Sequence, residues 1–268
     1  METITIETKL ELAKHQDAIE KLFLGAFGSP LPLDLWRWAY LDNPNGEPIV
    51  TLCYDDGVLV GHYAMIPMPL RSDREHLNSY ISMTTMVAIS HRKHYLFTSL
   101  AHAAYAIAKV RGVDFVMGFP NEQSAPGFRK RLDWNLPPSD YVASLTKAEV
   151  IAAAKSLQGL VGNSDSFRLD LLNESVRSWR LSKPGSTYHW VEGLAFKEYG
   201  DSVDLMAFNH PDQLVALPEG RSVNLLLPAT VTSLLPHKVF DYQFGGLSLS
   251  SPFEPDRIHR QMALSDVF

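Results

Sequence analysis

The chain has 268 residues, of which 46% are hydrophobic and 20% are charged, and its formal net charge is −6. Binding a polyanion through counterion release needs many surface cations, so this charge argues against nucleic acid as a partner. No apolar stretch reaches the roughly 20 residues that cross a bilayer, and the single cysteine, Cys53, excludes an internal disulfide and a cysteine-built zinc site.

Hydrophobic periodicity and turn chemistry predict the elements of the first half in chain order. One helical stretch ends at Gly28 and a later one at Gly112, a residue type that favours helix C-termini. Between them, Asp55-Asp56-Gly57 joins two apolar runs and gives a strong hairpin signal. The predicted helices cover about 9–27, 96–112 and 127–132, and residues 34–40 are predicted to form a second helix or a turn. The predicted strands cover about 49–54, 58–65, 79–89, 115–119 and 141–145.

A change to small and polar residues over 157–166 predicts a linker. We place a domain boundary there, which gives a first domain over 1–156 and a smaller second domain over 167–268. The second half again mixes strands with short helices, and no fixed-period repeat relates it to the first. Its predicted strands cover about 203–208, 223–227 and 240–249, and its predicted helical pieces cover about 211–217 and 229–235.

Residues 90–95, Ser-His-Arg-Lys-His-Tyr, lie at the predicted junction between a strand and a helix. The first amides of a helix lack partners and lie at the positive end of its dipole, so such a junction attracts anions. Arg92, Lys93 and the two histidines add cationic or potentially cationic side chains. The turn therefore favours a phosphate-bearing ligand, and a solvated basic loop is the alternative interpretation.

Three segments occur in the order found in GNAT acyl-CoA N-acyltransferases. Residues 83–100 are similar to the family's cofactor strand, loop and helix, and Arg92 matches its leading Arg or Gln. Residues 112–121 resemble the fifth strand, and residues 128–134 (Phe-Arg-Lys-Arg-Leu-Asp-Trp) resemble the closing aromatic signature. With the hairpin and the helix before it, the resemblance covers roughly residues 35–134.

The resemblance implies a mixed α/β (α+β) fold with a mostly antiparallel sheet flanked by helices, followed by a smaller GNAT-like second half. In this family the pantetheine arm of acyl-CoA pairs with the cofactor strand like an added strand, and the pyrophosphate lies on the loop amides. Such binding uses backbone groups, so side chains can vary while binding persists. Carried over to this chain, the residues that bind acetyl-CoA or another acyl-CoA are Met86, Val87, Arg92, Lys93, His94, Tyr95, Leu96 and Asn121.

The sequence departs from the family pattern at three positions. Tyr95 and Phe97 stand where the loop usually has glycines, and a Cβ there can obstruct the approach of phosphate to the amides. Phe128 stands where the family commonly has a tyrosine acid, and it cannot donate a proton. These departures favour an alternative function, a non-catalytic GNAT-fold binding or scaffold module.

Acyl transfer to an amine needs a proton acceptor, and the middle of the cofactor strand has no carboxylate. We take His62, on the second hairpin strand, as the candidate base, with a structural histidine as the alternative. Trp36 and Trp38 are candidates for the acceptor pocket, because this helix borders the substrate groove in similar proteins. Aromatic clusters also build cores, which is the alternative role for both tryptophans.

After the boundary, Trp179-Arg180 with Pro184 and Tyr188 resembles a pattern of two-domain members of the family. The second half lacks an arginine-bearing turn like that of the first. We therefore expect a degenerate GNAT-like domain that shapes the acceptor cleft and does not hold a second cofactor.

The leading hypothesis is an N-acyltransferase that moves an acetyl or related acyl group from acyl-CoA to an amine of a small polar acceptor, such as an amino sugar. A Fem-like transferase that uses aminoacyl-tRNA shares the two-domain architecture, but the negative charge disfavours tRNA. We expect no metal, nucleic acid or membrane partner. The first residues are mixed and charged, unlike a signal peptide, so we expect a cytoplasmic location.

Overall fold

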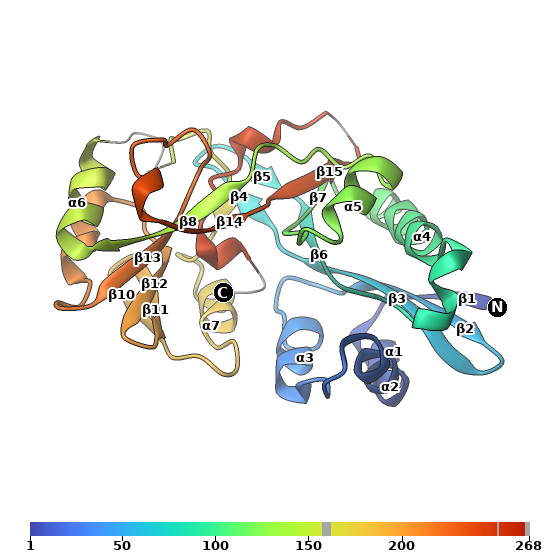
Figure 1. Ribbon diagram of the computed structural model, residues 1–268. Helices are drawn as coiled ribbons and strands as arrows, with labels where there is room; N and C mark the ends of the chain where they lie inside the picture. Colours follow the sequence, from blue (N-terminus) through green and yellow to red (C-terminus); the bar gives the residue numbers. More distant parts are fainter. Residues whose placement is uncertain (157–161, 251, 266–268) are drawn as a thin grey trace.

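The computed structural model describes residues 1–156, 162–250 and 252–265 (Figure 1). In this part of the chain the strands form two six-stranded sheets and one small sheet of three strands. In its spatial order, the first sheet contains β1 (Glu2–Ile6), β2 (Ile49–Asp55), β3 (Val58–Pro67), β6 (Ser79–Val87), β7 (Phe115–Gly118) and β15 (Gly245–Ser248). In the same way, the second sheet contains β10 (Tyr188–Val191), β11 (Leu194–Tyr199), β12 (Ser202–Ala207), β13 (Ser222–Leu227), β8 (Asp140–Thr146) and β14 (Lys238–Tyr242). The small sheet contains β5 (His76–Leu77), β4 (Leu70–Arg71) and β9 (Arg168–Leu169).

Helices flank both large sheets (Figure 1). The α-helices are α1 (Lys9–Ala13), α2 (Gln16–Phe27), α3 (Leu33–Tyr40), α4 (Leu96–Val110), α5 (Ala125–Arg131), α6 (Lys147–Ser156) and α7 (Glu174–Arg180). The 3₁₀-helices are η1 (Ile89–His94), η3 (Pro211–Ala216), η4 (Leu235–His237), η5 (Pro255–Arg257) and η6 (Met262–Leu264). The prediction of a mixed fold with mostly antiparallel sheets flanked by helices is confirmed.

Helix α4 covers one face of the first sheet, and its apolar stripe forms a core with residues of β2 and β3. Gly61 allows this close packing, because a Cβ there would lie 2.8 Å from Leu100 Cδ1. Helices α2 and α3 contribute to a separate core that also contains β3 and β6 residues. Strand β6 therefore contributes residues to both cores and lies between them.

In the described residues, both large sheets are antiparallel except at one pair of neighbouring strands. Each sheet has a single parallel pair in the described residues, and the ladder of that pair extends over three residues of each strand. In the first sheet β6 and β7 pair as far as Ile81 and Met117, and in the second sheet β12 and β13 pair as far as Asp204 and Asn224. In both sheets the ladder of the parallel pair ends at these residues, although the pair occupies a different place in the strand order.

Several sequence predictions were wrong in detail. The helix predicted over 9–27 is two helices, because α1 ends at Ala13 and the next begins at Gln16. The strand predicted over 240–249 is β14 followed by β15, which belong to different sheets. The helix predicted over 229–235 is absent except for Leu235, the first residue of η4, and turns occupy 229–230 and 233–234. Strands β1, β10 and β11 and helices α6 and α7 were not predicted, although Gly193 marks the β10–β11 turn with a φ of 97°.

The two sheets exchange strands between the sequence halves. Strand β8 precedes the predicted boundary and pairs within the second sheet, whereas β15 lies near the end of the chain and pairs with β7. Residues 157–161 of the predicted linker lie outside the described residues. The division into 1–156 and 167–268 therefore stays a prediction. None of the helices that the structure describes is long and apolar enough to span a membrane.

Candidate functional site

The predicted cofactor strand, β6, has an open edge. In the described part of the chain, β6 pairs with β7 only from Ser79 to Ile81, and no strand continues the ladder along residues 82–87 on that side. Four of these six residues in a row, from Ser82 to Thr85, are partly exposed, while Met86 is buried and Val87 is partly exposed. The strand therefore presents main-chain donors and acceptors that an extended ligand can pair with.

A β-bulge lies in the middle of this edge. His62 of β3 pairs with Met86 and Ala64 pairs with Met83, so two β6 residues oppose one residue of β3. Thr84, one of the two, has a φ of 52°. A β-branched residue at positive φ stores strain of about 1–3 kcal/mol and persists only where its surroundings hold it. The bulge turns the local peptide groups away from the regular ladder.

The side chain of His62 supports the bulge through a hydrogen bond. Its side chain is buried, and Nδ1 lies 2.8 Å from the carbonyl oxygen of Thr84. A carbonyl only accepts, so Nδ1 carries the proton, and Nε2 is buried without a hydrogen-bond partner among the described residues. Burial lowers the pKa of His62 to about 4. The imidazole is therefore neutral near pH 7, donates to the bulge and packs edge-on against Tyr40.

The cationic turn follows directly after β6. It forms η1, and the side chains of Arg92, Lys93, His94 and Tyr95 are exposed. His91 is different, because its Nε2 donates to Asp55 Oδ2 over 3.0 Å and ties the turn to the β2–β3 hairpin. This hydrogen bond lowers the pKa of Asp55 below its usual value. The sequence indicates Asp55 only as a residue of the hairpin turn and gives no local sign of its pairing with His91.

Tyr95 takes over the backbone role of a glycine. Its φ is 56°, in the left-handed region, and it is the N-cap residue directly before α4. The side chain is 75% exposed, so it lies away from the core. Leu96, the next residue, is buried beneath the first turn of α4. The loop therefore keeps a glycine-like backbone with a tyrosine in it, at a cost in strain of about 1–2 kcal/mol.

Phe97 fills the space between α4 and α5. Its ring lies edge-to-face on Phe128 with centroids 5.3 Å apart, and Phe128 in turn packs on Trp134 at 4.5 Å. A Cβ on Gly127 would lie 3.2 Å from the Phe97 ring. Phe97 and Phe128 therefore belong to one aromatic cluster, which closes the side of the turn that faces α5.

Asn121 lies at the entrance to α5 and is exposed. Its Oδ1 accepts hydrogen bonds from the backbone N–H groups of Gln123 and Ser124, at 3.1 and 2.9 Å. The side chain thus shapes the turn that follows β7.

Both predicted acceptor residues are buried: Trp36 is 2% exposed and Trp38 is 4% exposed. Trp38 Nε1 donates to the carbonyl of Trp179, and Trp179 Nε1 donates back to the carbonyl of Trp38, at 2.7 and 2.8 Å. The two rings stack with centroids 5.0 Å apart. Trp38 thus joins α3 to α7 across a long stretch of sequence, while Trp36 packs against Tyr40.

No cluster of three or more potential metal-ligating side chains occurs in the described ranges.

Comparison with known proteins finds one family model that resembles the first half of the chain. A family model described as "Acetyltransferase (GNAT) domain" matches residues 9–136. No curated protein sequence matches the chain.

Solved structures share the fold of nearly the whole chain. A GCN5-related N-acetyltransferase from Kribbella flavida has 11% identity and a TM-score of 0.64, covering 94% of this chain and 73% of that one. A probable N-acyltransferase from Enterococcus faecalis V583 has 9% identity and a TM-score of 0.62, covering 93% and 73%. A tandem GNAT protein from the clavulanic acid biosynthesis pathway has 10% identity and a TM-score of 0.52, covering 94% of this chain and all of that one. These likenesses show the fold alone. The family match covers residues 9–136, a little less than half of the chain, and shows that this segment is similar to a GNAT acetyltransferase domain, while tandem GNAT proteins are among the structures that share the fold.

Proposed function

We propose that this chain transfers an acetyl or related acyl group from acyl-CoA to an amine of a small polar acceptor, with the acyl-CoA bound along the open edge of β6. The observation that carries the proposal is the separation of β6 from β7 beyond Ile81, directly before a cationic turn. An extended pantetheine arm carries amide groups that can pair with the main chain next to Met86 and Val87.

The turn supplies the phosphate end of this site. The amides of Leu96 and Phe97 lie in the first turn of α4 and have no partner within that helix, so they are available to a pyrophosphate. Arg92, Lys93 and His94 are exposed beside them and add charge-assisted hydrogen bonds. In this arrangement side chains supplement a loop whose usual glycines are replaced.

The bulge supplies the electrostatic part of catalysis. A peptide N–H that the bulge turns out of the ladder can polarise the thioester carbonyl as negative charge develops on its oxygen. We assign His62 to the support of this bulge, because Nδ1 is bound to Thr84 and the low pKa makes the ring a weak base. Water then carries the proton from the acceptor ammonium to solvent.

An amino sugar is the acceptor that we propose to test first, beside other small amines. The assay follows thiol release from acetyl-CoA in the presence of each amine, and calorimetric titration measures the binding of acetyl-CoA and CoA. Micromolar binding with amine-dependent thiol release is the expected result. Absence of binding at millimolar acetyl-CoA would contradict the proposal and favour the scaffold module or the Fem-like transferase.

A further inference from the structure

Hydrogen bonds lead from the open edge of β6 into the core between the first sheet and α4. Ser82 Oγ donates to Tyr63 Oη over 2.9 Å, and the hydroxyl oxygens of Tyr63 and Tyr105 lie 2.8 Å apart. Trp134 Nε1 donates to Tyr105 Oη over 2.9 Å. Ser82 is partly exposed, whereas the other three side chains are at most 5% exposed. The hydroxyl network of Ser82, Tyr63 and Tyr105 therefore connects the edge of β6 to two buried phenols.

The hydroxyl protons of this network can all point away from β6. The indole N–H of Trp134 can only donate, so it occupies one lone pair of Tyr105 Oη. With Ser82 donating to Tyr63, the proton of Tyr63 is directed to Tyr105, and the proton of Tyr105 is directed to a further acceptor. In this arrangement the lone pairs of Ser82 Oγ are available to accept a proton at the β6 edge.

The far end of the network borders a cavity beside α4. Tyr105 lines this cavity of about 440 Å³ together with His102, Lys109 and Asp133, whose side chains are exposed. The ring of His102 lies 6.3 Å from that of Tyr105, measured between centroids. A polar cavity of this size admits water, which can accept a proton from a phenol at its wall. Solvent therefore reaches the Tyr105 end of the network without passing the edge of β6.

Burial keeps both phenols neutral. It raises the pKa of Tyr63 well above its usual value, and it also raises the pKa of Tyr105. Neither side chain therefore gives up a proton unless it receives another one. The network thus favours a concerted shift, in which each hydroxyl accepts one proton and donates its own.

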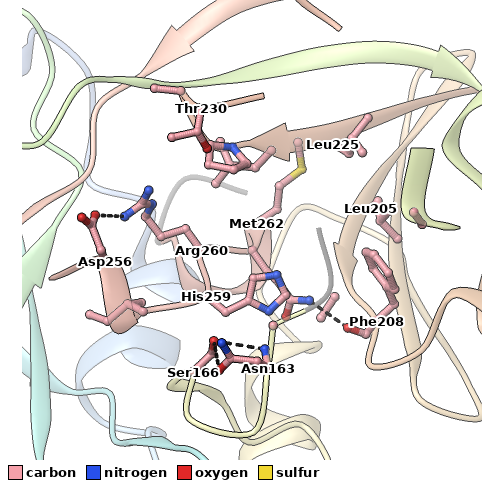
Figure 2. Close-up of a pocket in the computed structure, with 18 of the residues that line it drawn as sticks. Asn163, Ser166, Leu205, Phe208, Leu225, Thr230, Asp256, His259, Arg260 and Met262 are labelled. Carbon is pink, nitrogen blue, oxygen red and sulfur yellow. Dashed lines mark hydrogen bonds and ion pairs between the residues drawn. The ribbon is translucent and has the colours of Figure 1, made fainter. Parts of the chain in front are cut away.

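The second sheet has different chemistry at the matching place. The ladder of its parallel pair ends at Asp204 and Asn224, and the next residues are Leu205 and Leu225. Figure 2 shows both leucines at a cavity of about 880 Å³, which they line. In the first sheet the residue of β6 directly after the parallel pair is Ser82. A leucine side chain cannot accept or donate a proton, so the hydroxyl at this place distinguishes the first sheet from the second.

Ser82 lies close to the reacting atoms of the proposed acyl-CoA site. There the pantetheine arm runs from the turn past Met86 and Val87 to the bulge, where Thr84 has its positive φ. Ser82 comes two residues beyond Thr84, about 7 Å along the strand, on the side away from the turn. The sulfur of the thioester then lies toward the turn, which leaves the Ser82 side to the acceptor amine.

We propose that Ser82 is a catalytic residue that accepts a proton from the acceptor ammonium, and that Tyr63 and Tyr105 are positioning residues that pass the charge on to water in the α4 cavity. This inference rests on the proposed function. One N–H bond of the ammonium breaks and an O–H bond forms on Ser82. The former proton of Ser82 moves to Tyr63, that of Tyr63 moves to Tyr105, and that of Tyr105 moves to water. The three hydroxyls end neutral, and the amine keeps the electron pair that attacks the thioester carbon.

Two amines test whether the network removes a proton. Glucosamine is largely protonated at neutral pH, whereas hydroxylamine is largely the free base. Tyr63→Phe keeps the ring and removes the hydroxyl, so it should lower kcat for glucosamine by about 10- to 100-fold with an unchanged KM for acetyl-CoA. For hydroxylamine its kcat should stay at the parental value. The loss with glucosamine should shrink as the pH rises toward about 9, because the amine then loses its proton in solution.

Matched variants separate this role from a structural one. Tyr80, on the same strand, is buried and its hydroxyl donates to the carbonyl of Glu47, outside the network, so Tyr80→Phe should keep the parental kcat for both amines. Ser82→Ala should behave as Tyr63→Phe does, and Ser82→Thr, which keeps a hydroxyl, should retain activity. The double variant of Ser82→Ala and Tyr63→Phe should be no slower than either single variant, because both interrupt one path.

The outcomes distinguish this inference from the proposed function. A parental kcat of Tyr63→Phe for glucosamine, or an equal loss for glucosamine and hydroxylamine, would overturn the relay while acyl transfer itself stands. Absence of transfer by the parent to both amines would overturn the proposed function and the relay together. A loss confined to glucosamine, with acetyl-CoA binding unchanged in calorimetry, is the result that the relay predicts.

Discussion

The buried imidazole of His62 gives a prediction whose size follows from the structure. Its pKa is lowered from 6.5 to about 4, mainly by burial. The unfolded chain therefore binds more protons than the folded chain between these values, so the free energy of unfolding falls as the pH falls through this window. The stability due to neutral His62 is complete above pH 6.5, and about 3 kcal/mol of it is lost by pH 4.

Urea unfolding between pH 4 and pH 8, followed by tryptophan fluorescence, measures this effect. His62→Leu removes the donor to the Thr84 carbonyl and should lower the free energy of unfolding at pH 7.5 by about 1–3 kcal/mol. His62→Gln can still donate and should lose less. In both variants the decline of stability between pH 6.5 and pH 4 should shrink, while His102→Gln, at an exposed histidine, should keep the parental slope. A parental slope in His62→Leu would refute the reasoning.

The same variants separate the two roles of His62 in catalysis. If His62 supports the bulge, His62→Gln should retain part of the acyl-transfer rate and His62→Leu should lose most of it. A base at Nε2 would instead be lost in both variants, together with the rise of activity that accompanies its deprotonation.

Three further outcomes are expected. Arg92→Ala should raise the acyl-CoA dissociation constant by roughly 10- to 150-fold in calorimetry, with Lys93→Ala weaker in the same direction, while the melting temperature stays unchanged. Tyr95→Gly should keep or tighten acyl-CoA binding, because glycine adopts the φ of 56° without strain and removes a side chain beside the amides that would bind the pyrophosphate. A tenfold higher dissociation constant in this variant would contradict this. Trp38→Phe removes the N–H that donates to Trp179 and should lower the free energy of unfolding by about 1–3 kcal/mol in urea titrations, and an unchanged value would place the pair outside the stabilising core.

Local signals in the sequence predicted the elements that depend on local chemistry. The hairpin of β2 and β3 follows from Asp55-Asp56-Gly57, and the structure gives Asp56 and Gly57 the positive φ values, 47° and 78°, that such a turn needs. Helix α4 follows from its apolar period, and Gly112 after it has a φ of 67°. Pairing between strands that are distant in the sequence has no local sequence signal. The pairing of β8 with the second sheet and of β15 with the first could therefore not be predicted from local patterns.

The candidate site was predictable in position but not in its details. The order of strand, basic turn and helix predicted a basic segment between β6 and α4, and Arg92 and Lys93 lie there in η1, while their role in binding stays a prediction. Nothing in the sequence indicated the bulge, because a threonine at positive φ runs against its own preference and depends on the hydrogen bond from His62. The burial of Trp38 depends on Trp179, 141 residues away, and a reading of the aromatic helix alone cannot supply that partner.

Amide hydrogen exchange with and without CoA tests the central claim most directly, because binding along β6 must protect the main-chain groups of its open edge. The account predicts slower exchange of the amides in residues 82–87 and at Leu96 and Phe97 when CoA is added, with little change in β13. Unchanged exchange of these amides at millimolar CoA would contradict the assignment of the acyl-CoA site to this strand.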